Sequence, residues 1–145
     1  MADITDLELL IGRWRQVVDA PRHVEEKVDG DMTLEWLRGE KVILERSIAQ
    51  NSMFPESVVV IMVADQDAEG DFTAHYFDSR SVSRLLHMTF REGVWKWWRH
   101  ASNADDFDQR FEGTLTEDGR TIHSSCYLVQ NGEWIHDFDV VYTRV

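Results

Sequence analysis

Polar and charged side chains interrupt rows of apolar residues in this chain. Two of them are arginines, whose burial requires hydrogen-bond acceptors. Alternation places Arg46 and Arg84 on strand faces that otherwise carry apolar residues. A guanidinium keeps its proton and needs several hydrogen-bond acceptors once water is removed. A ligand carboxylate, phosphate or enolate would supply them in a two-pronged contact, and so would an internal partner such as Glu35, Glu45 or Asp78. Both interpretations stay open, and together the two arginines predict a polar cavity.

Neutral polar and aromatic residues complete the predicted ligand-binding site beside the two arginines: Trp36, Tyr76, Trp98, Gln109 and His136. Tyr76 and His136 can donate or accept a proton, and an arginine can stabilise an oxyanion. His136 also fits a hydrogen-bonded core position, and Trp98 fits simple packing. Gln16 and Tyr142 interrupt apolar rows in the same way.

Common catalytic motifs do not occur in the sequence, and this narrows the reactions to consider. There is no phosphate loop, no dinucleotide-binding fingerprint and no thiol paired with a convincing base. Binding of a small molecule without a reaction is therefore the favoured hypothesis. If a reaction follows, we expect a non-redox, metal-free isomerisation or cyclisation, in which the cavity folds a flexible apolar substrate. Whether the protein is an enzyme stays open.

The spacing of histidines and cysteine does not favour a metal or redox site. Histidines fall about one to a predicted strand, and alternation turns His75, His87 and His123 outward. No His-x-His or His-Glu-x-x-His pair offers two ligands from one element, so we predict no metal. Cys126 is the single cysteine, so it cannot form an internal disulfide, and we expect a buried, inert thiol.

The elements that must position these residues are short alternating runs separated by glycine turns. Asp-Gly and Asn-Gly between such runs are strong hairpin signals, because the tight turn needs positive φ at both central residues. The predicted strands cover residues 13–19, 30–38, 41–50, 57–64, 71–78, 82–91, 94–100, 107–115, 121–130 and 134–144. Serially joined strands of this kind commonly hide their edges by closing into a barrel.

A short helix precedes the first strand. Thr5 and Glu8 have the spacing of a capping box, and Gly12 is a natural stop, so we expect a helix over residues 6–11. The fold prediction is therefore all-β: a closed antiparallel up-and-down barrel of about 8–10 strands with this helix, and residues 1–145 as one domain.

Alternation also assigns an inward face to most strands. Six of these rows contain predicted site residues. They are Met32, Leu34 and Trp36; Val42, Leu44, Arg46 and Ile48; Phe72, Ala74 and Tyr76; Val82, Arg84, Leu86, Met88 and Phe90; Phe107, Gln109, Phe111 and Leu115; and Trp134, His136, Phe138, Val140 and Tyr142. A further row, Trp14, Gln16 and Val18, begins the first strand. The run at 57–64 is unbroken and rich in valine, so we expect it to be buried on both faces. Tryptophans occur on both faces of the run at 94–100, and its inward side stays undecided.

Composition excludes several classes of partner. The formal charge is −12 and the 15 lysines and arginines are dispersed, which disfavours nucleic acid and anionic membranes. No apolar run approaches the length of a membrane span, and the N-terminus lacks a secretion signal. We therefore expect a cytoplasmic protein that binds a small molecule; a homodimer is compatible with the sequence.

Three longer segments carry a family resemblance: residues 75–79, 107–122 and 134–144, to which the Gly-Arg-Trp at 12–14 adds a weaker match. Together they resemble a family of mostly uncharacterised bacterial proteins related to lipocalins, the calycin-like barrels. The resemblance implies a closed antiparallel barrel around a cavity and no assigned reaction. The chain departs from the family pattern at residues 124–127, where a Gly-Arg-Trp-Glu-like run is expected.

A more distant resemblance is to nitrobindin-like barrels, which bind haem through a histidine in the last strand. His136 lies in the corresponding strand, so haem stays an alternative; no other cofactor is expected. A filled barrel serving as a structural or oligomerisation module is a further alternative.

Overall fold

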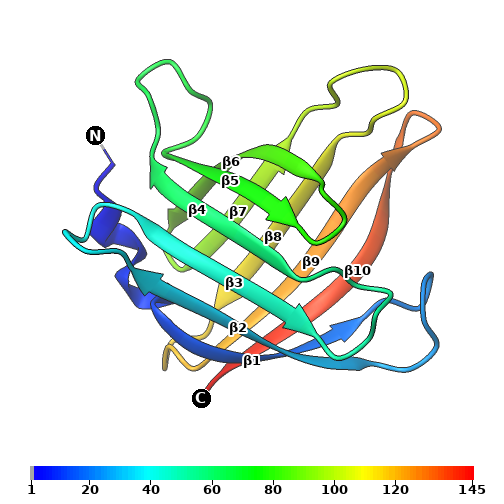
Figure 1. The fold of residues 1–145 in the computed structure, drawn as a ribbon, viewed down its shortest axis with the longest axis horizontal. Helices are drawn as coiled ribbons and strands as arrows, with labels where there is room; N and C mark the ends of the chain where they lie inside the picture. The colour runs from blue at the N-terminus through cyan, green and yellow to red at the C-terminus, as the bar shows by residue number, and fades with distance from the viewer. Residues whose placement is uncertain (1) are drawn as a thin grey trace.

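The alternating runs form ten strands in the computed structural model, which describes residues 2–145 (Figure 1). After a short helix, η1 (Ile4–Leu10), the strands are β1 (Gly12–Asp19), β2 (Val28–Trp36), β3 (Ile43–Ala49), β4 (Ser57–Val63), β5 (Phe72–Asp78), β6 (Ser83–Arg91), β7 (Val94–Arg99), β8 (Gln109–Leu115), β9 (Thr121–Gln130) and β10 (Glu133–Arg144). Each strand runs antiparallel to the next one along the chain.

Pairing between the first and last strands closes the sheet into a barrel. Trp14 on β1 lies opposite Met32 on β2 and opposite Arg144 on β10. Every strand therefore has two hydrogen-bonded neighbours, so the barrel formed by residues 12–144 exposes no full-length strand edge. The predicted closed antiparallel barrel with a short N-terminal helix is confirmed.

Two tight turns show how the sequence sets the hairpins. Glu92 and Gly93, between β6 and β7, have φ values of 52° and 78°, and Asn131 and Gly132, between β9 and β10, have 53° and 77°. Positive φ at both central residues gives a turn whose twist matches that of the flanking strands. These turns join neighbouring strands with the shortest possible connection.

The N-terminal helix is a 3₁₀ helix capped differently from our prediction. Asp3 is the cap: its carboxylate accepts from the Thr5 backbone N–H at 2.9 Å, and the Asp6 carboxylate accepts from the Asp3 N–H at 3.2 Å. The predicted box of Thr5 with Glu8 is wrong, because Asp3 and Asp6 offer the same spacing two residues earlier. Leu7 and Leu10 are buried in the barrel core, so η1 covers one end of the barrel (Figure 1). No helix in the described part of the chain is long and apolar enough to cross a bilayer.

Most predicted inward rows are confirmed by burial. The buried residues include Trp14, Gln16 and Val18 on β1, Phe72 and Ala74 on β5, Leu86, Met88 and Phe90 on β6, and Val140 and Tyr142 on β10. The inward side of β7, which the sequence left undecided, carries Trp95, Trp97 and Arg99. Trp97 lies opposite Phe111 of β8 and stacks on it with ring centroids 5.5 Å apart, so both rings face the interior.

Strand β3 faces the opposite way from our prediction. Glu45 and Ser47 point inward, whereas Arg46 and Ile48 lie on the outer surface. Apolar residues occur on both faces of this strand, so its own pattern does not fix the register. Pairing with β2 does: Glu45 lies opposite the fully buried Leu34, and opposed residues share a face.

Strand β10 contains a β-bulge that reverses its first half. His136 pairs with Tyr127 and Phe138 pairs with Cys126, so Asp137 is an extra residue on β10. An unpaired residue shifts the alternation by one position. After the bulge, Phe138, Val140 and Tyr142 face inward as predicted. Before it, Trp134 and His136 face solvent, so the prediction for these two is wrong.

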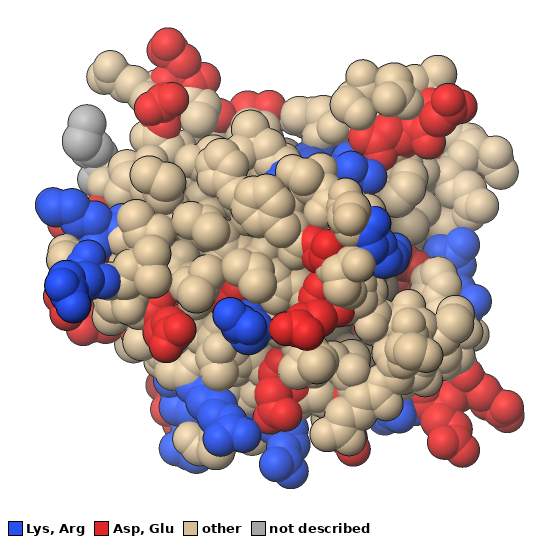
Figure 2. All heavy atoms as spheres, in the orientation of Figure 1, with Lys and Arg blue, Asp and Glu red and all other residues tan. Residues whose placement is uncertain are grey.

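The prediction that both faces of the valine-rich strand are buried is wrong for its outer face. Val59 and Ile61 are buried inside, but Met62 is 42% exposed. Phe77 on β5 and Leu85 on β6 are also exposed, at 46% and 51%. We call Val58, Val60, Met62, Phe77 and Leu85 the outer apolar patch. Figure 2 shows a broad uncharged surface over the β3–β5 side of the barrel, to which this patch contributes.

Candidate ligand-binding cavity

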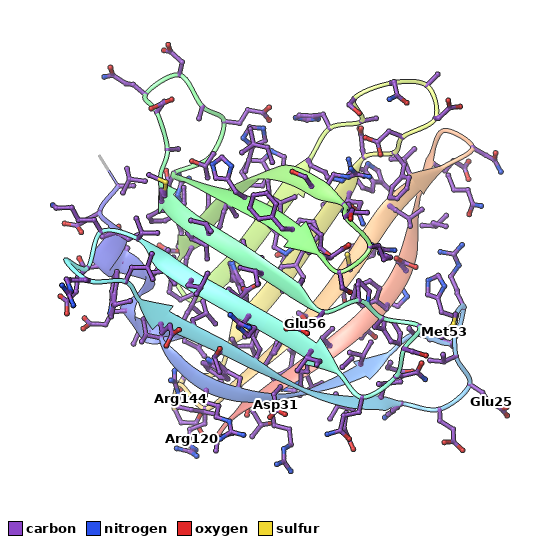
Figure 3. The ribbon with its side chains drawn as sticks, in the orientation of Figure 1. Glu25, Asp31, Met53, Glu56, Arg120 and Arg144 are labelled. Carbon is purple, nitrogen blue, oxygen red and sulfur yellow. The ribbon has the colours of Figure 1, made fainter. Side chains whose placement is uncertain are left out.

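The barrel encloses a cavity of about 610 Å³ that opens at one end. The residues from loops that line it come from four connections, β1–β2, β3–β4, β5–β6 and β7–β8: His23, Phe54, Arg80 and Phe107. These connections lie at the end of an up-and-down barrel opposite the η1 end. Figure 3 shows these two ends of the barrel, with Met53 and Glu25 at the open end and Arg120 and Arg144 at the η1 end. The cavity has the volume of a typical small-molecule site.

Much of the inner wall of the cavity is apolar and aromatic. Trp95 and Phe111 meet edge to face with ring centroids 5.0 Å apart, and Trp97 stacks on the same Phe111 ring. Met32 and Leu86 add aliphatic surface. Interlocked rings of this kind hold their rotamers, so this wall is a rigid apolar surface for a ligand.

A polar group of residues lies on the wall formed by β1, β3 and β10. The Ser47 hydroxyl donates to the Gln16 side-chain oxygen at 2.9 Å, and Gln16 lies opposite Tyr142. Glu45 lines the cavity on the same strand as Ser47, and burial raises the pKa of its carboxyl to about 7. Among residues 2–145, no side chain pairs with this carboxyl by an ion pair or hydrogen bond. Glu45 is therefore available to a ligand.

Two clusters of ion pairs lie at the open end of the cavity, which we call the mouth. Within each cluster the arginine and the aspartate neutralise each other. Arg99 makes a two-pronged contact with Asp106 at 2.8 and 2.9 Å and donates to Gln109 at 2.7 Å. The Arg99 hydrogen bonds hold the pKa of Asp106 far below its usual range. At the next cluster, Tyr76 donates to Asp78 at 2.7 Å and Arg80 donates to it at 2.8 Å.

The pKa of Asp78 shows that this second cluster is ionised. Burial pushes the pKa of Asp78 upward, but hydrogen bonds from Arg80 and Tyr76 prevail and lower it to about 2. Burial, together with the same carboxylate, raises the pKa of Tyr76 well above its usual value, so Tyr76 stays a neutral donor. A third acid at the mouth, Asp137 from the bulge, accepts from Arg22 at 3.1 Å and lies 2.8 Å from His23.

Arg84 differs from the other arginines that line the cavity. Its guanidinium donates to the Ser83 backbone carbonyl at 3.1 Å, and no carboxylate in the described chain lies within ion-pair distance. Arg80 and Arg99 each have an aspartate partner. The side chain of Arg84 therefore carries a positive charge into the cavity lining that no described acid neutralises.

The structure brings together three of the predicted site residues and separates the others. Tyr76, Arg84 and Gln109 line the cavity. Arg46 lies outside, 57% exposed and 3.7 Å from Glu56, so its predicted inward position is wrong. His136 is also outside, with Nε2 2.6 Å from Asp139.

The two predicted tryptophans also miss the cavity. Trp98 points outward and donates to Glu69 at 3.0 Å, because alternation on β7 gives the inward positions to its neighbours. Trp36 is half-buried and packs against the core near the closed end. Cys126 is buried as predicted, and burial raises the pKa of its thiol to about 12, so it is inert near neutral pH.

Sequence reasoning missed Glu45, Arg99 and Asp137 as cavity residues. Arg99 had a usable signal, because Gln109 was already assigned inward and the two strands are hairpin neighbours. Glu45 would have required the β2–β3 register, and Asp137 required the bulge. No local pattern in the sequence marks either feature.

Comparison with known proteins identifies no family for this chain. No protein-family model matches the chain, and no curated protein matches it. The cavity and its side chains therefore carry the functional argument.

Proposed function

We propose that the barrel binds an amphipathic small molecule whose anionic group contacts Arg84 and whose apolar body lies against the aromatic wall. The observation that carries the proposal is the charge of Arg84, which lines the cavity without an acid partner among residues 2–145. A carboxylate, sulfonate or phosphate group would accept from its guanidinium in the geometry that arginine favours. Arg80 and Arg99 are already neutralised and would contribute less.

The remainder of the cavity supports an amphipathic rather than a fully polar ligand. Trp95, Trp97 and Phe111 offer a continuous apolar surface, and burial of such surface contributes about 25 cal/mol per Å². Glu45, Gln16 and Ser47 on the polar wall would pair with a hydroxyl or amide of the same ligand. The ligand would thus carry an acidic group near the mouth and a neutral polar group deeper in the barrel.

The proposal extends to family and to chemistry. A closed barrel around an open-ended cavity is the architecture of the calycin-like, lipocalin-related proteins that the sequence resembles, and we propose membership of that group. Binding without catalysis is the simpler function. Isomerisation or cyclisation would require a proton donor or acceptor, and Glu45 is better placed for that role than His136, which lies outside.

The haem alternative depended on His136 as the iron ligand. His136 faces solvent, so it cannot ligate iron inside the barrel. Addition of hemin should give no Soret band that depends on His136.

Fluorescence titration with anilinonaphthalene sulfonate tests the binding proposal, because this probe combines an anionic group with aromatic rings. Arg84→Leu should weaken probe binding about tenfold or more, the value of a lost charged hydrogen bond. Arg46→Leu is the matched control, since it removes the same group from the outer face, and its affinity should equal that of the wild type. Equal affinities in all three proteins would refute the role of Arg84.

Self-association is a second candidate function, favoured by the outer apolar patch. Val58 lies opposite Phe77 on adjacent strands, so the patch is continuous across β4 and β5. A second copy of the chain could cover it and form a homodimer. Light scattering tests this: Phe77→Glu should convert a dimer to a monomer, and a monomeric wild type at high concentration would rule it out.

A further inference from the structure

Two histidines and one glutamate from separate elements meet on the outer surface of the barrel. Glu69 comes from the connection between β4 and β5, His87 lies on β6, and His100 directly follows β7. One ligand atom from each of the three lies within 4.8 Å of the other two. We call these residues the outer His–Glu cluster.

Both imidazoles of the cluster lie against the same carboxylate, that of Glu69. His100 Nε2 lies 2.8 Å from Glu69 Oε2, and His87 Nε2 lies 3.4 Å from the same oxygen. Trp98 donates its indole N–H to the other carboxylate oxygen at 3.0 Å, which fixes the orientation of Glu69. His87 and Trp98 are opposed on β6 and β7, so the sheet itself positions this side of the cluster.

His87 has few polar partners of its own. Its Nε2 faces Glu69, and its other ring nitrogen, Nδ1, is buried and has no hydrogen-bond partner in the described part of the chain. The ring centroids of His87 and His100 are 5.9 Å apart, so both imidazoles reach the same carboxylate and leave space between them for one ion.

We propose that the outer His–Glu cluster binds a divalent transition-metal ion, with Zn²⁺ as the best match. Two imidazole nitrogens and one carboxylate oxygen form a common three-residue zinc ligand set, which leaves a fourth position for water or a substrate. With ligand bonds of about 2.0–2.1 Å, tetrahedral geometry separates the ligand atoms by about 3.3 Å. The observed separations bracket this value, so side-chain rotations suffice.

The ligand types exclude the common hard cations. Mg²⁺ and Ca²⁺ prefer shells of oxygen ligands, whereas this cluster offers a single carboxylate and two nitrogens. The formal charge of −12 also favours the approach of any cation. His87 points away from the cavity that its neighbours Leu86 and Met88 line, so this site is independent of the proposed ligand.

Isothermal titration with Zn²⁺ on the chelator-treated full chain, without a histidine tag, tests the proposal. We expect one Zn²⁺ per chain, and His87→Ala, His100→Ala and Glu69→Gln should each weaken binding at least tenfold. His123→Ala is the matched control, because it removes an exposed histidine from the outer face of β9, and it should bind like the wild type.

Co²⁺ provides a second readout, since its visible absorption reports tetrahedral coordination. The wild type and His123→Ala should give an intense band that the His87→Ala/His100→Ala double variant lacks. Circular dichroism of the metal-free variants checks that they remain folded. No binding to the wild type, or equal binding to the folded double variant, would overturn the proposal.

Discussion

Tyr76 and Arg84 lie directly opposite each other on β5 and β6, with both side chains lining the cavity, yet only Tyr76 has an internal acid partner. The Tyr76 hydroxyl and Arg80 both contact Asp78, so this carboxylate is committed to them and not to Arg84. The charged groups at the mouth therefore serve two purposes. The paired ones stabilise the barrel, whereas Arg84 is available to a ligand.

Arg99→Leu should destabilise the fold far more than Arg84→Leu. Arg99 and Asp106 are both at least 90% buried, and loss of one partner from a buried pair costs about 3–5 kcal/mol because the other charge is left uncompensated. Arg84 has no such partner in the described chain, so its removal should change the free energy of unfolding by less than about 1 kcal/mol. Urea denaturation of both variants measures the difference, and equal losses would contradict our division of the arginines.

Glu45 should make the protein less stable as the pH rises. Burial raises its pKa from 4.5 to about 7, so between these values the folded state holds a proton that the unfolded state has lost. The free energy of unfolding therefore falls as the pH rises from about 4.5 to 7, by about 3 kcal/mol from this group. Below pH 4.5 both states are protonated, and the contribution is constant.

Glu45→Gln should abolish this dependence and stabilise the protein at pH 8. Urea denaturation of the variant and the wild type at pH 5 and pH 8 measures it, and the two proteins should differ mainly at pH 8. An unchanged pH slope in the variant would show that Glu45 is ionised freely in the folded state.

Leu86→Trp should block the cavity. Leu86 is buried and lines the cavity, so an indole at this position would occupy the space that a ligand needs. Binding of anilinonaphthalene sulfonate should fall at least tenfold while the fold persists, because the extra volume enters a void. Leu85→Trp is the control, since Leu85 precedes Leu86 in the chain, faces outward and is 51% exposed. Probe binding that is equally strong in both variants would show that the probe binds elsewhere.

Gly30→Ala should destabilise the barrel, because β2 and β3 approach closely at this position. A Cβ atom on Gly30 would lie 2.4 Å from the Ile48 carbonyl oxygen and 2.6 Å from the Gln16 side-chain nitrogen. Overpacking of this kind typically costs about 1–3 kcal/mol. Thermal unfolding measures the loss, and Thr33→Ala on the same strand should cost less. An unchanged melting temperature in Gly30→Ala would show that the strands separate easily here.

The fold was predictable because its signals are local. Turn residues such as Asn131 and Gly132 and the alternation of β1, β5 and β6 identify antiparallel hairpins without any knowledge of distant contacts. Closure of the barrel followed from the need to satisfy sheet edges.

The site was only partly predictable because two of its determinants are not local. β3 carries apolar residues on both faces, so the position of Glu45 depends on its pairing with Leu34. The orientation of His136 depends on the bulge at Asp137, and no glycine, proline or turn residue near this position predicts the bulge. Arg84 was placed correctly because β6 has no bulge and its inner face carries the buried Leu86, Met88 and Phe90 at strict alternation.

Native mass spectrometry of the protein purified from its own host tests the central claim most directly. We predict that the wild type retains one small molecule, which dissociates as an anion, and that Arg84→Leu purified in parallel has lost it while Arg46→Leu keeps it. A wild type that carries no small molecule, or an Arg84→Leu variant that retains the same molecule at the same occupancy, would contradict the account.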